Sequence, residues 1–244
     1  MPKKRRHETP RSLPVRGAQR EDGLLALQIG GVTQSISVPD AASAADGAGP
    51  ASVGYWARML PPECPASALL LGLGGGTTAA LLARRCPGVR MLGVERDAEV
   101  LALSREAFGL DTLPGLEVVE ADAFAWVAAQ FDEDGALSPD AARFDLICVD
   151  LFEGGRLVAG TLATPFLRQL AALVAPGGIV TSNLMVTGRT PEQLHRLRRV
   201  FHIERELRLH GNLVVHLIPL PSEGQTPGDG VTADAPPTPP PPPQ

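Results

Sequence analysis

A glycine-rich turn directly after a short apolar run is the first feature of this sequence that could do chemistry. Residues 68–71 are apolar, and the glycines that follow them are Gly72, Gly74, Gly75 and Gly76. Glycine lets a backbone turn sharply and approach a ligand without a Cβ in the way. Backbone N–H groups at the start of the following helix can then face the polar part of a nucleotide-like ligand. The pattern predicts a nucleotide site beyond the end of a buried strand.

Two acids lie where the next two strands are expected to end. Glu95 ends the apolar run MLGVE, one βαβ unit after Gly72, and a carboxylate there can accept hydrogen bonds from both hydroxyls of a ribose. Asp122 follows the next run, in EADAFAW, where a carboxylate can accept from the exocyclic amine of adenine and Ala123 would contact the ring. Asp122 is also suited to cap a helix, and its two oxygens make both roles compatible.

Asp150 closes the run FDLICVD, whose nearly continuous apolar character is typical of a strand covered on both faces. Ligands of open parallel sheets bind beyond the carboxyl ends of the strands. An acid at that position can accept a proton from an attacking nucleophile, so we predict Asp150 as the general base. Ser182 and Asn183 follow a later apolar run, and we interpret them as turn residues.

The composition predicts one folded domain between two tails. Residues 1–19 are basic and interrupted by proline, and residues 221–244 end in a proline run, so neither segment is expected to form a core. Residues 20–62 are expected to form a β-hairpin and a short helix, and residues 63–220 a Rossmann-like domain.

The charge and the cysteines exclude several classes of function. The formal net charge is −5, without a sustained basic stripe outside the N-terminal tail, so no nucleic-acid partner is expected. No apolar stretch is long enough to span a membrane, and the N-terminus lacks a signal-peptide core. Cys64, Cys86 and Cys148 are far apart in the sequence, which predicts no metal site and suits a reducing cytoplasm.

The elements that must position these residues alternate between strand and helix. This alternation predicts an α/β fold with a doubly wound, mostly parallel sheet and helices on both faces. Residues 202–209 and 212–220 are expected to add an antiparallel C-terminal hairpin, and residues 23–38 a small N-terminal hairpin. The N-terminal hairpin offers a sheet edge through which two copies could pair as a homodimer.

The motifs taken together resemble a known fold. LGLGGGTT, GVERD, EADAFAWV, FDLICVD and LVAPGGIVTSNL are similar to the class I S-adenosylmethionine-dependent methyltransferase fold. LALQIGGVTQ is similar to the LxLDGxxQ hairpin of the spermidine synthase (polyamine aminopropyltransferase) branch, and YWARML to its YHEML helix. The resemblance covers residues 24–220 and implies a transferase that uses S-adenosylmethionine or its decarboxylated form, without a metal.

Together, the residue patterns and the resemblance predict which residues bind the donor and the acceptor. The resemblance makes Asp150 the general base and places the acceptor substrate against Tyr55 and against Glu153, an acid retained at the fourth place of the motif that begins with Asp150. The residues expected to hold the nucleoside donor are Gln34, Gly72, Gly74, Gly75, Gly76, Glu95, Asp122 and Ala123.

Departures from the branch pattern bear on the reaction. Gly75 stands where the branch has the acid of GGGDGG, and Leu151 and Phe152 replace two small polar residues after the base. A polyamine needs several carboxylates to offset its desolvation. The carboxylate of the full donor would suit bare N–H groups of the glycine run. We therefore favour methyl transfer to a small acceptor over aminopropyl transfer.

Two alternatives remain open. One is a polyamine aminopropyltransferase in the strict sense, active in polyamine biosynthesis. The other is a non-catalytic nucleotide-binding or scaffold domain, since a fold alone does not give a function. A dehydrogenase is less favoured, because the turn lacks GxGxxG spacing and the fourth strand ends in an acid.

Overall fold

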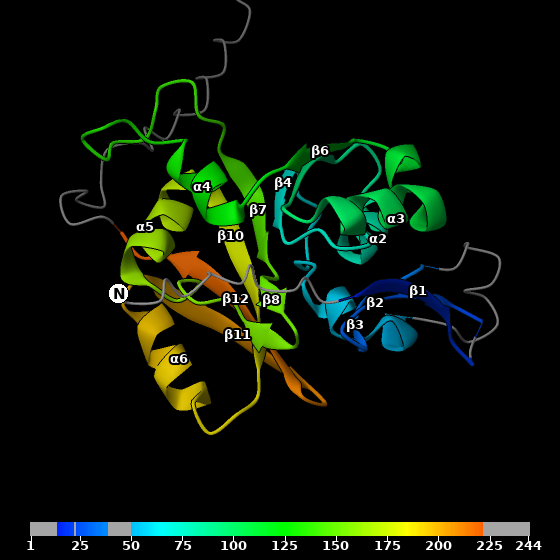
Figure 1. Cartoon of the computed structure of the whole chain (residues 1–244). Coiled ribbons are helices and arrows are strands. Elements are labelled where there is room, and N and C mark those ends of the chain that lie inside the picture. The colour runs from blue at the N-terminus through cyan, green and yellow to red at the C-terminus, as the bar shows by residue number, and fades with distance from the viewer. Residues whose placement is uncertain (1–13, 22, 39–49, 222–244) are drawn as a thin grey trace, which may run out of the picture.

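A seven-stranded, mostly parallel sheet forms the centre of the protein (Figure 1). The computed structural model describes residues 14–21, 23–38 and 50–221. The strand order is β11-β12-β10-β7-β4-β5-β6, and only β11 and β12 run antiparallel to their neighbours. The strands are β4 (Ser67–Leu71), β5 (Arg90–Glu95), β6 (Leu116–Glu120), β7 (Phe144–Val149), β10 (Val174–Met185), β11 (Phe201–Leu209) and β12 (Asn212–Pro219).

Helices cover both faces of this sheet. Successive residues of the central strands point to opposite faces, and they are apolar and buried on both. Leu69 and Leu71 of β4 face one core cluster, and Ala68 and Leu70 face the other. The first cluster includes residues of α4, α5 and α6, and the second residues of α2 and α3. The helices are α2 (Thr77–Arg85), α3 (Ala98–Phe108), α4 (Ala123–Ala128), α5 (Thr164–Leu173) and α6 (Thr190–Arg198). The predicted doubly wound fold with a C-terminal antiparallel hairpin is confirmed.

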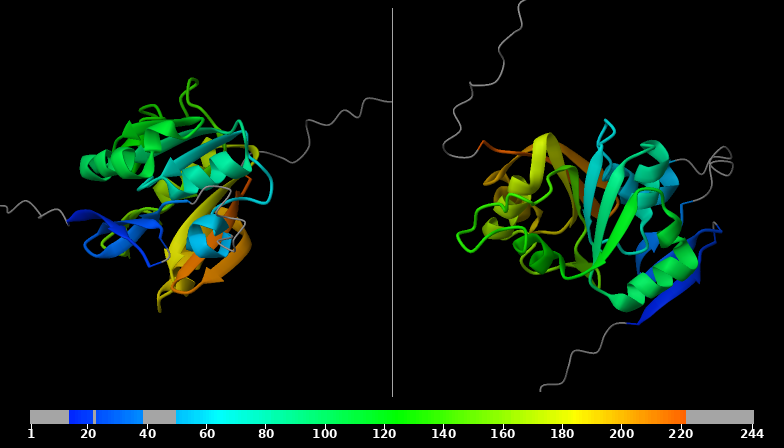
Figure 2. Two further views of the ribbon diagram at one scale, coloured as in Figure 1. Left: turned by 90° about the vertical axis from the view of Figure 1, so that its right-hand side faces the viewer. Right: turned by 90° about the horizontal axis from the view of Figure 1, so that it is seen from above.

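A small antiparallel sheet precedes the central domain and packs beside α3 (Figure 2). It consists of β1 (Val15–Gln19), β2 (Leu25–Ile29) and β3 (Val32–Ile36), and the 3₁₀ helix η1 (Pro50–Arg58) follows. Gly30 and Gly31 both have positive φ, as a two-residue hairpin turn requires, so the predicted N-terminal hairpin is confirmed.

The assignment of residues 15–19 to the basic tail was wrong, because these residues form β1. Their pairing with β2 uses backbone groups, from Val15 opposite Ile29 to Gln19 opposite Leu25, and does not need an apolar pattern. The remaining tail predictions, for residues 1–13 and 222–244, lie outside the described residues.

Several short elements were not predicted from the sequence. β8 (Phe152–Glu153) and β9 (Arg156–Leu157) form a two-stranded hairpin, and η2 (Leu110–Thr112) follows α3. β10 begins at Val174, before the Pro-Gly-Gly segment of residues 176–178, and its register with β7 shifts across that segment.

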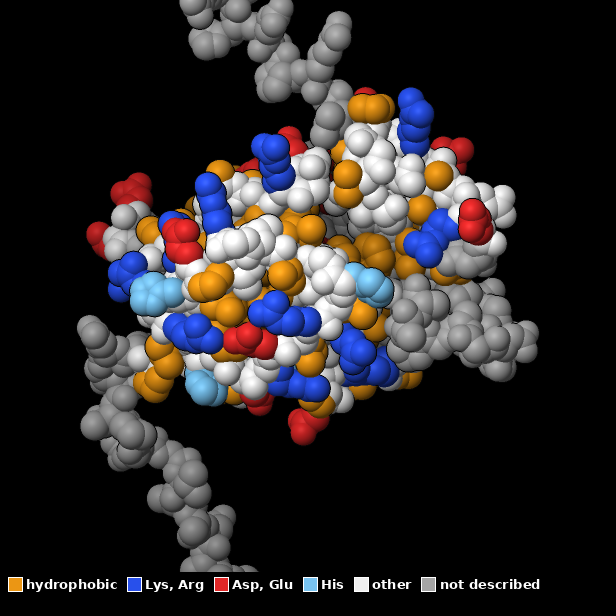
Figure 3. Space-filling model, turned by 90° about the horizontal axis from the view of Figure 1, so that it is seen from below, with side chains coloured by type: hydrophobic (Ala, Val, Ile, Leu, Met, Phe, Trp, Pro, Cys, Tyr) orange, Lys and Arg blue, Asp and Glu red, His pale blue; other side chains and the backbone are white. Residues whose placement is uncertain are grey.

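The outer face of α6 and β11 is basic. Figure 3 shows arginine and histidine side chains gathered on this face. Two of the arginines are paired with acids on the same elements: Arg196 with Glu192 at 2.7 Å and Arg198 with Glu206 at 3.1 Å. Exposed pairs of this kind contribute little to stability. In the part of the chain that the structure describes, no helix is long and apolar enough to cross a membrane.

Cys64 and Cys86 form a disulfide that the spacing of the cysteines did not predict. Their Cα atoms lie 5.4 Å apart because the end of α2 returns beside the segment that leads into β4. Cys148 remains a free, buried thiol in β7.

Cys64→Ser should lower the free energy of unfolding by about 3 kcal/mol, because the disulfide closes a loop across a sequence separation of 22 residues. Urea denaturation under oxidising conditions measures the difference. The wild type in reductant is the matched control and should unfold like the variant. Equal stability of the two proteins without reductant would show that the disulfide does not constrain the unfolded chain.

Candidate functional site

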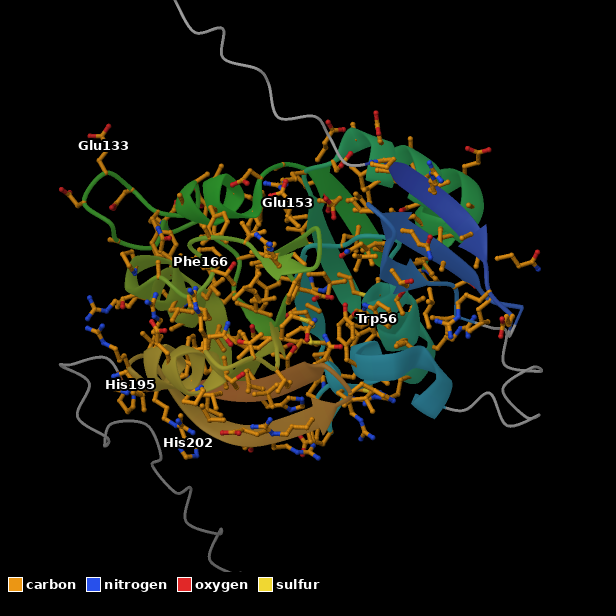
Figure 4. All side chains as sticks on the ribbon, turned by 60° about the horizontal axis from the view of Figure 1, so that its bottom comes forward. Trp56, Glu133, Glu153, Phe166, His195 and His202 are labelled. Atoms are coloured by element: carbon orange, nitrogen blue, oxygen red, sulfur yellow. A yellow bond between two sulfur atoms is a disulfide. The ribbon has the colours of Figure 1, made fainter. Side chains whose placement is uncertain are left out.

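A cleft lies beyond the carboxyl ends of β4, β5, β6 and β7, beside β3 and η1. It encloses about 750 Å³, including its open mouth. Seven of the predicted site residues line it: Gln34, Gly72, Gly74, Glu95, Asp122, Ala123 and Asp150. Four others do not line it: Tyr55, Gly75, Gly76 and Glu153. In Figure 4 Trp56, a lining residue, lies between the small sheet and the strands of the central sheet.

The glycine turn brings two strand ends into close contact. Gly72 has a φ of +84°, and a Cβ there would lie 2.3 Å from the carbonyl oxygen of Asp150. The Asp150 N–H donates to the carbonyl of Leu71 at 2.9 Å, which holds the end of β7 against the end of β4. Only glycine fits at position 72, so the turn and the predicted base are fixed together.

The glycine N–H groups already have acceptors within the protein. That of Gly74 donates to Glu95 Oε2 at 2.9 Å, that of Gly75 to Ser35 Oγ at 2.7 Å, and that of Gly76 to the carbonyl of Leu73 at 3.0 Å. The expectation that the glycine run offers bare N–H groups to a donor carboxylate was therefore wrong.

The first residues of α2 can supply backbone donors to a ligand instead. Thr77 and Thr78 line the cleft, and the N–H groups at a helix start have no acceptor within the helix. Thr77 is fixed by its hydroxyl, which donates to the carbonyl of Ile36 at 2.7 Å and accepts from the Ile36 N–H at 2.9 Å. β3 of the small sheet and the start of α2 are thus joined beside the cleft.

Ser35 explains why position 75 carries no acid. It is 2% exposed, and a Cβ at Gly75 would lie 2.8 Å from the Ser35 Cβ and 3.3 Å from Phe108 Cδ1. A side chain at position 75 would therefore displace β3 from the turn. The sequence pattern could not show this contact, because it joins residues from separate sheets.

The two acids at the end of β5 and after β6, Glu95 and Asp122, both line the cleft. Glu95 accepts from the Gly74 N–H through Oε2 and from the Arg96 and Asp97 N–H groups through Oε1, at 2.9 and 3.2 Å. Asp122 caps α4, since its Oδ1 accepts from the N–H groups of residues 124 and 125, each at 3.0 Å. Its Oδ2 has no hydrogen bond among the described residues, which leaves it available to a ligand amine.

Asp150 is held by two donors from opposite ends of the chain. The Tyr55 hydroxyl donates to Oδ2 and the Asn183 amide to Oδ1, each at 2.9 Å. Asn212 Nδ2 donates in turn to Asn183 Oδ1 at 3.0 Å. Burial raises the pKa of the Asp150 carboxyl to about 6, with a smaller contribution from the Glu95 charge, although both hydrogen bonds act in the opposite direction.

The interpretation of Asn183 as a turn residue was wrong. It lies within β10, is 2% exposed and orients the Asp150 carboxylate. Its only sequence signal was an amide near the end of an apolar run, which also fits a turn.

Tyr55 does not line the cleft itself but binds Asp150, which does. The Tyr55 and Trp56 rings lie 4.4 Å apart, and Trp56 lines the cleft while Tyr55 reaches Asp150. Burial, followed by the Asp150 charge, raises the pKa of the Tyr55 hydroxyl well above its usual value. Tyr55 is therefore a hydrogen-bond donor at neutral pH.

Glu153 lies outside the cleft. Its carboxylate pairs with Arg96 at 3.2 Å, and its side chain is 66% exposed on β8. Leu151, Phe152 and Val158 line the cleft instead. The side of the cleft near Asp150 is thus largely apolar.

Comparisons with known proteins place the chain beside two kinds of transferase. It is 30% identical over 118 residues to a probable polyamine aminopropyl transferase of Bifidobacterium longum. The matched segment covers 48% of this chain and 24% of the relative. It is 31% identical over 140 residues to a trans-aconitate 2-methyltransferase of Azoarcus sp. This match covers 57% of this chain and 46% of the relative. No family model matches.

A solved structure, a probable spermidine synthase from Corynebacterium glutamicum, superposes with a TM-score of 0.62 at 21% identity, covering 90% of this chain and 82% of that one. The matches confirm the resemblance to the spermidine synthase branch of the class I methyltransferase fold. The chain spans less than half the length of the two curated relatives.

The raised pKa of Asp150 predicts a stability loss with rising pH. The folded protein resists ionisation of this carboxyl, so the free energy of unfolding should fall as the pH rises from about 4 to about 6, by up to about 3 kcal/mol. Asp150→Asn should lack this component. Chemical denaturation of both proteins at pH 4 and pH 7 measures it, and parallel pH dependences would contradict the assignment.

Proposed function

We propose that this chain is a spermidine synthase-like transferase that binds S-adenosylmethionine, or its decarboxylated form, and transfers an alkyl group to a small acceptor. The observation that carries the proposal is the cleft itself. It brings the glycine turn, Glu95, Asp122 and Asp150 together at the ends of four adjacent strands. This is where open parallel sheets bind their ligands.

Each group has a role in holding the donor. Glu95, fixed by three backbone N–H groups, would accept the ribose hydroxyls, and the free Oδ2 of Asp122 the adenine amine. Gln34 would contact the donor from β3, and Ala123 would pack against the base. The helix-start N–H groups of α2 would face the polar tail of the donor.

The chemistry follows from the positive sulfur of the donor. The acceptor's lone pair attacks a carbon bonded to the sulfonium, the carbon–sulfur bond breaks, and its electron pair stays on sulfur as a neutral thioether. The proton lost by the acceptor passes to the Asp150 carboxylate. A pKa of about 6 leaves this carboxyl ionised at neutral pH yet basic enough to accept the proton. Alignment of acceptor and donor supplies the rest of the rate acceleration.

We favour methyl transfer because few carboxylates line the part of the cleft where the acceptor would bind. Glu95 and Asp122 are committed to the nucleoside in this proposal, which leaves Asp150 as the acid on the acceptor side. Arg96 lines the cleft, and the acceptor side carries Leu151 and Phe152. A multiply charged polyamine would be desolvated here without enough carboxylates. Aminopropyl transfer is the second candidate, supported by the names of several relatives.

Mass spectrometry of reaction products tests the reaction. The protein is incubated with either donor and a panel of amines, phenols and carboxylic acids. The proposal predicts products that gain one methyl group, formed by the wild type and lost in Asp150→Asn. Products that gain an aminopropyl group from the decarboxylated donor would reverse the order of the two candidates.

Glu95→Gln should weaken binding of S-adenosylhomocysteine about tenfold to hundredfold, because charge-assisted hydrogen bonds to the ribose are lost. Glu120→Gln is the matched control: Glu120 pairs with Glu95 in the neighbouring strand but is exposed and does not line the cleft. Titration calorimetry measures both variants. An unchanged affinity in Glu95→Gln would refute the ribose assignment.

A further inference from the structure

We propose that His216 is a positioning residue: by binding the last residue of η1 it sets the Tyr55 hydroxyl against the Asp150 carboxylate. The inference rests on the proposed function only in taking Asp150 as the base. The contact itself is a hydrogen bond of 2.8 Å between His216 Nε2 and the carbonyl oxygen of Arg58.

The segment that carries Tyr55 needs an anchor. η1 is a 3₁₀ helix interrupted at Gly54, whose φ of 61° and ψ of −144° lie outside the helical region. Short 3₁₀ segments have weaker hydrogen-bond geometry than α-helices and add little stability of their own. The position of Tyr55 therefore depends on contacts that η1 makes with the rest of the protein.

His216 supplies such a contact from the middle of the sheet. It lies in β12 between Thr181 of β10 and Arg205 of β11, and it is 0% exposed. A carbonyl oxygen can only accept, so Nε2 carries a hydrogen. Nδ1 is buried without a partner among the described residues.

Burial keeps the His216 ring neutral. Burial is the largest cause and lowers the pKa of the imidazole, Arg205 lowers it further, and Glu204 and the bond to Arg58 oppose them. The ring is thus a fixed N–H donor at neutral pH. An unpaired buried nitrogen is costly, and the neighbouring β12 positions are Val and Leu. A donor for η1 accounts for a polar side chain at this position.

One turn of the chain connects the Arg58 carbonyl, which His216 binds, to Tyr55. The Met59 N–H donates to the carbonyl of Trp56 at 3.1 Å, which closes the chain over Arg58. Trp56 packs against the Tyr55 ring at 4.4 Å, and the Tyr55 hydroxyl bonds Asp150 at 2.9 Å. Release of the Arg58 carbonyl would free this aromatic pair to move away from Asp150.

The single tyrosine of the chain gives a direct readout, since Tyr55 labelled with ¹³C at Cζ yields one NMR signal. In the wild type the hydroxyl should titrate well above pH 10. His216→Met removes the donor and should bring the tyrosine pKa down toward its ordinary value. His216→Gln places an amide N–H at similar reach and should keep it high. His216→Asn, whose amide is too short, replaces the methionine variant should that protein not fold.

The matched control is His202→Met, a change on the neighbouring strand at an exposed histidine (Figure 4). It should leave the tyrosine signal unchanged. An unchanged signal in His216→Met, or equal loss in the methionine and glutamine variants, would overturn the proposal, because the ring would then act by packing alone.

Kinetics give the second arm. The Tyr55 hydrogen bond lowers the Asp150 pKa, so its loss should move the rise of kcat to higher pH in both His216→Met and Tyr55→Phe. The double variant should be no slower than Tyr55→Phe. An additive loss would overturn the positioning role. A protein without transferase activity would refute the proposed function, while the tyrosine signal would still decide the role of His216.

Discussion

The structure depends on the close approach of two backbones, Gly72 after β4 and Asp150 after β7. A Cβ at position 72 would lie 2.3 Å from the Asp150 carbonyl oxygen, and the Asp150 N–H donates to Leu71 at 2.9 Å. This contact forces the glycine turn and the acid to share one edge of the sheet. Because β5 and β6 are paired in parallel beside β4, Glu95 and Asp122 follow at the same edge. The cleft is a consequence of this arrangement, and its chemistry is set by which side chains the strand ends carry.

The Asp150 carboxylate then joins parts of the chain that are distant in sequence. Tyr55 of η1 and Asn183 of β10 donate to it, and Asn212 of β12 donates in turn to Asn183. Burial makes ionisation of this carboxyl unfavourable and the two hydrogen bonds partly restore it, which leaves a base suited to neutral pH. The small N-terminal sheet contributes on the opposite rim, where Ser35 binds the Gly75 N–H. The small N-terminal sheet and the C-terminal strands therefore both contribute to the cleft.

The strands, helices and acidic strand ends could be predicted from the sequence because their signals are local. Apolar runs mark buried parallel strands, and the ends of those runs locate Glu95, Asp122 and Asp150. Asn183, Ser35 and His216 could not be predicted, because their roles depend on partners many residues away. The same reason hid the Cys64–Cys86 disulfide, and β1 was missed because backbone pairing leaves no mark in composition. The glycine N–H groups were misjudged because their acceptors, Glu95 and Ser35, come from other strands.

The central claim is that the cleft is an S-adenosyl nucleoside site. The most direct measurement is the thermal unfolding of the wild type with increasing S-adenosylhomocysteine, compared with NAD at equal concentrations. A ligand that binds the folded state stabilises it by about 2.7 kcal/mol at roughly 100 times its dissociation constant. We predict a concentration-dependent rise in Tm with S-adenosylhomocysteine and none with NAD. A rise with NAD alone, or no rise with either ligand, would contradict this account of the cleft.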